Sequence, residues 1–498
     1  MNVFLLYPDR NFDPQTPLPP NAADLTQDLA LETLWQAMAQ GDKFLFETAR
    51  LVLLSGSQEM GVIHYRQQIL QDCLKNPATV RALYQIPIEA IENKQRHWLG
   101  IFSHYPAGIL SSAVEMLEML VGLLHRLRQI ADEHAADFES PGFRRFFAMI
   151  QQELDDACFA EMEAHLRQLR FREGVLLSAE LGPGNEGTNY VLRKPNTPDG
   201  LMKRLLSRKS PVYSFTLHPR DDHGARALGE LRDRGLNLVA NAAAQSADHI
   251  DGFLTVLRRE LAFYIGALNL YEQLTALGHP VAFPGLHPAE ERRHTYRGLY
   301  DVCLALTMRK RVVANDGEAE GKDLMLITGA NQGGKSTFLR SIGLAQVMMQ
   351  AGLFVPAEEF SANLCSGIFT HYRREEDASM KSGKLDEELK RMSAIVNHLR
   401  PHALVLFNES FAATNEREGA EIARQVVDAL LERRVKVFFV THQYELARGY
   451  HERQAPNALF LRAERQPDGS RTYRVRPGDP QPTSHGEDVY RKVFEKER

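Results

Sequence analysis

Gly329-Ala330-Asn331-Gln332-Gly333-Gly334-Lys335-Ser336-Thr337 is the stretch that decides the fold of the C-terminal part of this chain. It follows the apolar run 324–327 and precedes a helical pattern at 338–350, so it is predicted to turn a strand into a helix. Its glycines let backbone N–H groups close around phosphate oxygens, and the positive end of the new helix points at the same anion. The motif predicts a nucleoside triphosphate site. Lys335 is expected to reach the β- and γ-phosphates, and Ser336 to offer its hydroxyl to Mg²⁺. The predicted nucleotide contacts are Gly329, Asn331, Gly333, Gly334, Lys335, Ser336 and Thr337.

The composition sets few limits. A length of 498 residues predicts two or more domains. The 59 Lys and Arg against 64 Asp and Glu give a net charge of −5, which neither demands nor excludes a nucleic-acid partner. The four cysteines lie far apart with no C-x-x-C pair, which is typical of reduced thiols in a cytoplasmic protein. No signal peptide is expected, and no stretch is expected to reach the ~20 apolar residues of a membrane helix. We therefore expect a cytoplasmic protein without a membrane partner. Association with the nucleoid stays open.

The N-terminal part, 1–178, is predicted to be a helical core. Apolar residues recur at helical spacing through 111–132, and a second stripe runs through 250–268. The second stripe predicts a long helix at about 246–277, within a lever and connection that covers 246–299. Long apolar stripes are typical of helices that pack on other helices, so both parts are interpreted as scaffold.

The intervening segment, 179–245, is rich in turn-forming and charged residues. Ten Lys and Arg against five Asp and Glu lie between Arg193 and Arg234, a local net charge of +5. Such a basic insertion could lie on the phosphates of DNA, in the manner of a clamp, or it could be a solvated surface without a ligand. If it binds DNA, the expected contacts are Lys203, Arg204, Arg208 and Lys209.

From about residue 300 the strand and helix patterns alternate. Apolar runs at 324–327, 403–407 and 435–440 predict buried strands, and helical patterns follow at 338–350, 385–399 and 419–433. A hairpin is predicted at 456–476. The expected fold is therefore α + α/β: an N-terminal helical core and lever, followed by a P-loop domain at 300–498 with a mostly parallel sheet.

Two strand ends add candidate catalytic groups. Asn408 and Glu409 follow the run 403–407, where P-loop ATPases carry one carboxylate that supports Mg²⁺ and a second that positions or activates the attacking water. Glu409 can serve as the second, whereas Asn408 carries no charge; Ser336, Asn408 and Glu409 form the predicted Mg²⁺ site. His442 follows the run 435–440 and is predicted to contact the γ-phosphate or the water.

Taken together, these motifs resemble the ATPase domain of the MutS family. The resemblance rests on GANQGGKST, on the strand that ends in NES at 403–410, on the loop FAATN at 411–415 and on VTHQYEL at 440–446. VPA at 355–357, VAND at 313–316 and TSHG at 483–486 are similar to further family elements. The match covers about 300 to 490, and weaker similarity reaches residues 65–77 and the helix at 246–277.

The resemblance implies an ABC-type ATPase that dimerises and sandwiches ATP between two subunits. The element that reaches across would be KSGK at 381–384, with Ser382 and Gly383 on the partner's nucleotide; a plain helix N-cap is the alternative. The family clamps double-stranded DNA and couples ATP binding to movement of long levers. A homodimer is the default expectation.

Two departures from the family pattern qualify this reading. The helical pattern begins within about 30 residues, which leaves no room for a mismatch-reading domain or a connector, so classical mismatch reading is not expected. Asn408 removes a carboxylate beside the metal, which predicts slow but real hydrolysis. Two functions stay open: an ATP-hydrolysing protein that binds double-stranded DNA in repair or related processing, and a nucleotide-gated scaffold whose partner is another protein.

Overall fold

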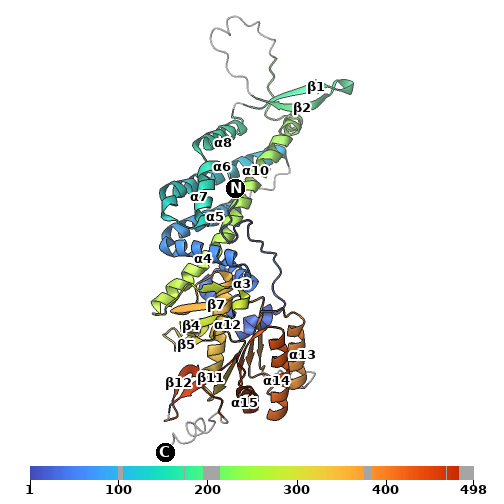
Figure 1. Ribbon diagram of the computed structural model, residues 1–498. Helices are drawn as coiled ribbons and strands as arrows, with labels where there is room; N and C mark the ends of the chain where they lie inside the picture. Colours follow the sequence, from blue (N-terminus) through green and yellow to red (C-terminus); the bar gives the residue numbers. More distant parts are fainter. Residues whose placement is uncertain (99–104, 173, 195–212, 375–382, 467, 482–498) are drawn as a thin grey trace, which may run out of the picture. The chain divides into compact units, whose positions relative to one another are not determined.

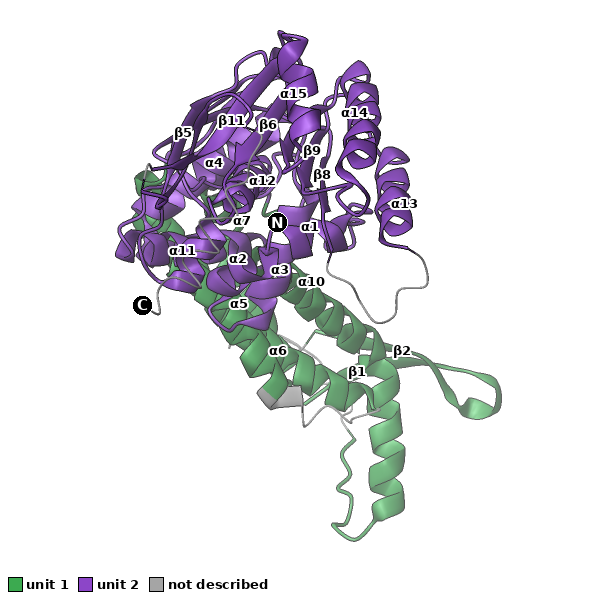
Figure 2. Ribbon diagram, turned by 90° about the horizontal axis from the view of Figure 1, so that it is seen from below, with its two compact units in different colours: residues 1–3, 81–138, 144–258 green, residues 4–80, 139–143, 259–498 purple. Residues whose placement is uncertain are grey.

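The computed structural model describes residues 1–98, 105–172, 174–194, 213–374, 383–466 and 468–481 (Figure 1). The chain forms two compact units (Figure 2). Unit 1 comprises residues 1–3, 81–138 and 144–258, and unit 2 comprises residues 4–80, 139–143 and 259–498. The combination of a helical part with a largely parallel α/β sheet confirms the predicted fold class. The finer division at residues 178, 245 and 299 stays a prediction.

Unit 1 is built mainly of helices that bury leucine and phenylalanine. Buried Leu117, Leu120, Leu124 and Leu127 recur along α6 at the spacing that places them on one face. The elements of this unit are most of α5 (Pro77–Trp98), α6 (Pro106–His134), η1 (Ala135–Asp137), α7 (Pro141–Glu153), α8 (Asp156–Leu169), the hairpin β1 (Leu176–Leu181) and β2 (Gly187–Arg193) with η2 (Pro183–Asn185), and the first part of α10 (Asp222–Ala276).

Helix α6 corrects one expectation from the sequence. The stretch Pro106–Asp137 is long and apolar enough to cross a membrane by length and composition, with a mean hydropathy of 1.7 over its most apolar window. The core helix of a soluble protein passes the same test, and ten residues of α6 are buried against its neighbours. The expectation that no stretch reaches this composition is therefore wrong, while the absence of a membrane partner stays a prediction.

The long helix also begins earlier than predicted. Helix α10 spans 55 residues from Asp222, so the turn-rich description of residues 222–245 is wrong. The segment 179–245 is predicted to be turn-rich from its content of turn-forming and charged residues, but its part from residue 222 onward is also rich in Ala, Leu and Arg, which favour helix. The hairpin β1–β2 places strands in the first part of the same segment. Helix α10 contacts this hairpin at Gly235, because a Cβ on Gly235 would collide with the side chain of Leu177.

Unit 2 contains a six-stranded sheet in the order β12-β11-β6-β10-β9-β8. All neighbouring pairs are parallel except the hairpin β11–β12. The strands are β6 (Leu324–Gly329), β8 (Ile368–Tyr372), β9 (Leu404–Asn408), β10 (Lys436–Val440), β11 (Ala458–Arg465) and β12 (Arg471–Pro477). The predicted strands at 324–327, 403–407 and 435–440 and the hairpin are confirmed, whereas β8 was not predicted.

Helices cover both faces of this sheet, which explains why its central strands are apolar throughout. One face, with Val405, Phe407 and Phe439, packs against α13 (Lys384–Val396), α14 (Glu416–Glu432) and α15 (Tyr444–Glu452). The other face packs against α12 (Lys335–Ala351), where Gly343 admits the Leu406 side chain closely.

A smaller four-stranded sheet, in the order β3-β7-β4-β5, lies in the same unit. Its short strands carry no strong sequence signal and were not predicted. They are β3 (Gly285–His287), β4 (His294–Leu299), β5 (Asn315–Glu318) and β7 (Glu359–Asn363), with η3 (Ala289–Glu291) between β3 and β4. The remaining helices of the unit are α1 (Ala22–Asp28), α2 (Leu31–Ala39), α3 (Lys43–Ser55), α4 (Met60–Lys75) and α11 (Val302–Met308).

A buried carboxylate anchors the first residues of unit 2. Glu260 on α10 is fully buried and accepts the backbone N–H groups of Leu5, Leu6 at 3.1 Å and Phe12 at 2.8 Å. Burial raises the Glu260 pKa, and these backbone donors oppose that rise. Arg66 donates from its Nε to the carbonyl oxygen of Leu6 at 2.8 Å. The segment is thus held by polar contacts with residues far along the chain.

Candidate nucleotide-binding and hydrolysis site

The candidate site lies at the carboxyl ends of three adjacent strands. Strand β10 lies between β6 and β9, with Val440 paired to Ile327 on one side and to Asn408 on the other. The loops that follow these strands therefore start side by side, although their sequence positions are far apart. This edge is where open α/β sheets bind ligands.

The glycine loop between β6 and α12 has the close backbone packing that a phosphate cradle requires. Gly329 has a φ of 105° and Gly334 a φ of 89°, a region that suits glycine. A Cβ on Gly333 would lie 2.8 Å from the carbonyl oxygen of Ala330. Gly334 is also the N-cap of α12, so the first N–H groups of the helix face the loop. These features fit a bound triphosphate.

Lys335 is held inside this loop. Its Nζ donates to the carbonyl oxygens of Gly329 at 2.9 Å and Ala330 at 3.0 Å, and the residue is 5% exposed. Burial lowers the Lys335 pKa to about 8; the charge of Glu409 opposes this shift and that of Arg471 adds to it. An arriving polyphosphate would supply the negative charge that favours the protonated amine.

Ser336 and Asn408, two of the three residues of the predicted Mg²⁺ site, are in contact. The Ser336 hydroxyl donates to the Asn408 side-chain oxygen at 2.9 Å. Both oxygens are ligand types that Mg²⁺ accepts, so the donor set fits this ion with one carboxylate fewer than usual. Among the described residues, no group of three or more His, Cys, Asp and Glu side chains gathers to hold a metal ion.

Glu409 and His442 form the second polar pair. Glu409 Oε1 and His442 Nε2 are 2.8 Å apart, and both side chains are about 30% exposed. The hydrogen bond from His442 is the main cause of a lowered Glu409 pKa, against the opposing effect of burial. Glu409 has a φ of 54°, an uncommon backbone state that is often found at functional sites. The carboxylate is therefore ionised at neutral pH, as a group that positions or activates water must be.

One pocket of about 620 Å³ brings most of these groups together. Its lining includes residues 331–337 of the glycine loop together with Glu409 and His442. Sequence reasoning missed most of the apolar part of this lining, which includes Leu304, Met308, Val312 and Tyr473. The similarity at 313–316 indicated the right region, but no local signal marked Tyr473, because the hairpin β11–β12 brings it there.

The same hairpin packs directly on the glycine loop. A Cβ on Gly334 would lie 3.2 Å from the carbonyl oxygen of Tyr473, and Arg471 donates from its Nε to the carbonyl oxygen of Asn331 at 3.2 Å. The shape of the phosphate loop thus depends on residues about 140 positions later in the chain.

Several predicted site residues lie outside the described residues: Ser382, Lys203, Arg204, Arg208, Lys209 and the TSHG element at 483–486. Gly383 is described and is the N-cap of α13, with extended φ and ψ of −63° and 151°. Its predicted contact with a partner's nucleotide stays a prediction.

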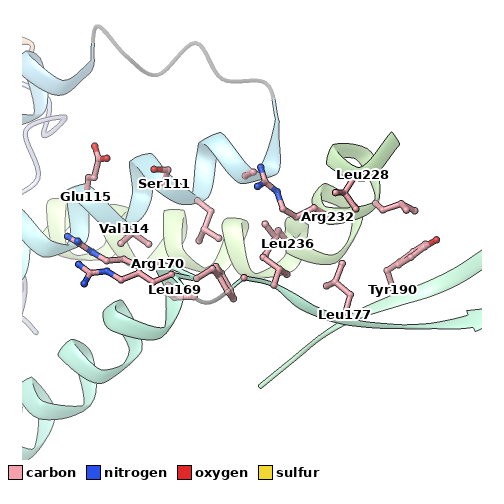
Figure 3. Close-up of a pocket in the computed structure, with 17 residues that line it drawn as sticks. Ser111, Val114, Glu115, Leu169, Arg170, Leu177, Tyr190, Leu228, Arg232 and Leu236 are labelled. Carbon is pink, nitrogen blue, oxygen red and sulfur yellow. The ribbon is translucent and has the colours of Figure 1, made fainter. Parts of the chain in front are cut away.

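A larger pocket of about 810 Å³ lies in unit 1, between α6, the end of α8, the hairpin β1–β2 and α10 (Figure 3). Leucines and Val114 line it together with charged Glu115, Arg170 and Arg232 (Figure 3). Arg170 pairs with Glu118, its Nε donating at 2.7 Å. None of the predicted site residues lines this pocket in the part of the chain that the structure describes.

Comparison with known families gives two consecutive matches. Residues 58–277 match the MutS2 N-terminal domain, and residues 325–494 match MutS domain V. The chain belongs to the MutS family. MutS domain V is an ATPase domain, and its match covers the strands of the six-stranded sheet from residue 325 onward.

Curated MutS relatives support the same assignment. MutS protein homolog 4 of Mus musculus is 33% identical over 168 residues, which are 34% of this chain and 17% of that protein. DNA mismatch repair protein MutS of Thermus aquaticus is 36% identical over 162 residues, 32% of this chain and 18% of that protein. DNA mismatch repair protein MutS of Shouchella clausii is 36% identical over 154 residues. The chain thus spans less than a fifth of the length of each of these three relatives.

Proposed function

We propose that this chain binds and hydrolyses ATP at the β6–β9–β10 edge as a nucleotide-gated homodimer on double-stranded DNA, in DNA repair or a related process. The observation that carries the proposal is the single pocket that holds the glycine loop, Glu409 and His442. A pocket that only stored a nucleotide would have no use for an ionised carboxylate paired with an imidazole.

The chain's own residues have separate tasks in this proposal. Lys335 and the loop amides bind the phosphates, and Ser336 and Asn408 would hold Mg²⁺, which supplies charge neutralisation at the phosphates. Glu409 accepts a proton from, or orients, the attacking water, and His442 keeps Glu409 ionised and in place. The apolar lining with Tyr473 suits a flat base. Hydrolysis is expected to be slow, because Asn408 contributes no charge at the metal.

The DNA and dimer parts of the proposal rest on other support. The relatives from Thermus aquaticus and Shouchella clausii are DNA mismatch repair proteins, and dimerisation with DNA binding is general in the family. The segment from Arg193 to Arg234 supplies the positive charge that backbone phosphates attract. The expectation that this chain does not read mismatches stays a prediction.

The test is ATPase turnover of the purified protein with and without double-stranded DNA, beside the variant Glu409→Ala. We expect turnover that DNA changes and that Glu409→Ala lowers by about 10²- to 10⁴-fold, with ATP still bound. A matched control is Glu445→Ala, which removes an exposed carboxylate from the nearby helix α15. Turnover that is equal in wild type and Glu409→Ala would contradict the proposal.

Asn408 favours a second function, a scaffold that ATP binding dimerises and whose partner is another protein. Without the first carboxylate, metal binding and turnover could be too weak to drive movement on DNA. A DNA mobility shift measured against salt separates the two functions, because phosphate contacts make affinity fall as salt rises. Reversing the charges of Lys203, Arg204, Arg208 and Lys209 should abolish the shift if these residues are the contact. If the protein binds ATP but gives no DNA mobility shift at low salt, the scaffold function is favoured.

A further inference from the structure

His371 occupies a fully buried position between the candidate catalytic loop and helix α13. It lies on the edge strand β8, paired in register with Phe407 of β9. Its ring stacks on Phe411, with centroids 5.2 Å apart and an angle of 18° between the planes. A polar ring enclosed in this way must satisfy both of its nitrogens locally.

Both nitrogens have partners, and the partners lie on different elements. Nδ1 is 2.7 Å from the hydroxyl of Ser410, the residue next to Glu409, and Nε2 is 3.0 Å from the carbonyl oxygen of Glu388 on α13. The Ser410 hydroxyl is also 2.5 Å from the carbonyl oxygen of His371. Ser410 is 1% exposed and Glu388 is 3% exposed, so water does not compete for these bonds.

The protonation state fixes the direction of the bonds. Burial, followed by the charge of Arg391, lowers the His371 pKa to about 4, so the ring is neutral and has one N–H. The carbonyl of Glu388 can only accept, so that N–H lies on Nε2. Nδ1 is then an acceptor, and the one hydroxyl hydrogen of Ser410 is shared between Nδ1 and the carbonyl oxygen of His371.

The other side of the loop is held as well. Gln443, which follows His442, donates from its Nε2 to the carbonyl oxygen of Phe411 at 2.9 Å. The backbone N–H of Glu409 donates to the carbonyl oxygen of Val440 at 2.9 Å. The segment 409–411 is therefore fixed to β10 on one side and, through His371, to β8 and α13 on the other.

We propose that His371 is a positioning residue that holds Glu409 in its working position and connects it to helix α13. This inference rests on the proposed ATP hydrolysis. Helix α13 begins at Lys384, directly after Gly383, which is the residue predicted to approach a partner's nucleotide. A displacement of α13 would be passed by two hydrogen bonds to the residue beside Glu409. The coupling would restrain hydrolysis until α13 is in place.

The test compares His371→Phe with Ser410→Ala and Ser410→Thr in basal ATPase assays without DNA. Phenylalanine keeps the stacking and removes both hydrogen bonds of the ring, while the Ser410 hydroxyl can still donate to the backbone carbonyl of residue 371. Alanine removes both bonds of the Ser410 hydroxyl and keeps the bond from the ring to Glu388, and threonine keeps the hydroxyl. We expect kcat to fall at least tenfold in His371→Phe and Ser410→Ala, since misplacing a catalytic group by about 1 Å costs on the order of 10²-fold. The Kd for a fluorescent ATP analogue should stay within twofold, and Ser410→Thr should recover most of the turnover.

A structural role alone would give a different pattern. Phe439→Leu is the matched control, because Phe439 is buried in the same layer and stacks on Phe407 of the neighbouring strand β9. Equal loss of kcat in Phe439→Leu would show general softening and overturn the inference. Unchanged kcat in both His371→Phe and Ser410→Ala would overturn it as well.

Amide hydrogen exchange tests the second link. Exchange in α13 should rise in His371→Phe and not in Ser410→Ala, which keeps the bond to Glu388. Equal exchange in the two variants would contradict the connection to α13. A wild-type protein without turnover overturns the proposed function itself, whereas turnover that His371→Phe leaves unchanged overturns only this inference.

Discussion

Gly333 is a position in the phosphate loop where one added methyl group should collide directly with its neighbours. A Cβ on Gly333 would lie 2.8 Å from the carbonyl oxygen of Ala330 and 2.8 Å from the Cβ of Ala463. Neither obstacle is the end of a flexible side chain: one is the backbone of the loop and the other is rooted on strand β11. In Gly333→Ala the loop or the strand must therefore move.

The size of the effect follows from this geometry. Forcing an extra carbon into a packed site costs about 1–3 kcal/mol. If the loop relaxes without ATP and must be restored to bind it, the Kd rises by roughly 5- to 150-fold, at 1.4 kcal/mol for each tenfold. Any strain that the free protein retains appears instead as a lower free energy of unfolding. The two losses together should reach about 1–3 kcal/mol.

Titration with a fluorescent ATP analogue measures the first loss, and urea unfolding without nucleotide measures the second. Gly449→Ala is the matched control, because a Cβ on this glycine of α15 meets nothing within 4 Å. It should leave the Kd unchanged and stabilise the helix by a few tenths of a kcal/mol to about 1 kcal/mol. A Gly333→Ala protein with wild-type Kd and wild-type stability would refute the packing argument.

Three further predictions concern Lys335, Asn408 and the loop that follows Glu409. Because burial lowers the Lys335 pKa from 10.5 to about 8, the unfolded chain binds more protons between these pH values, and the free energy of unfolding of the ATP-free protein should rise with pH in that window. Lys335→Met should raise the free energy of unfolding at pH 7 and flatten its rise with pH. Urea unfolding at pH 7.5 and 9.5 checks this, and a Lys335→Met protein whose free energy of unfolding still rises as in wild type would contradict it. Asn408→Asp places a carboxylate 2.9 Å from the Ser336 hydroxyl and should raise turnover and Mg²⁺ affinity about tenfold; an unchanged Mg²⁺ titration would sink the slow-hydrolysis idea. In Gly419→Ala a methyl group would collide with the carbonyl oxygen of Phe411, so kcat should fall about tenfold with ATP affinity kept, which steady-state kinetics and ATP titration can check.

The central strands of the ATPase sheet could be predicted because their signals are local. The runs that became β6, β9 and β10 are mostly apolar on both faces, and each leads directly into residues with known chemistry. Parallel strands end at one edge, so Lys335, Glu409 and His442 could be expected near one another before any coordinates.

Other parts depended on contacts that no local pattern encodes. Strand β8 carries no motif, and His371 gains its two partners from Ser410 and Glu388, which lie 39 and 17 residues later. Tyr473 reaches the nucleotide pocket only because the hairpin folds back on Gly334.

The start of α10 was missed for a different reason. The turn-forming and charged residues of the segment 179–245 indicated turns, although the part from residue 222 onward is rich in alanine and leucine. Helix propensity is a sum over many residues, and a 55-residue helix tolerates a few glycines that would end a short one.

Glu260 also has a consequence for the time at which this protein can finish folding. The backbone N–H groups of Leu5, Leu6 and Phe12 donate to the carboxylate of Glu260, which is synthesised about 250 residues later. A ribosome that adds about 5–20 residues per second would need roughly 12–50 seconds to supply it. During that interval the carboxylate that binds the backbone of Leu5 and Leu6 is absent, although both side chains are fully buried in the finished fold. The start of unit 2 is thus exposed to chaperones and proteases throughout the synthesis of unit 1.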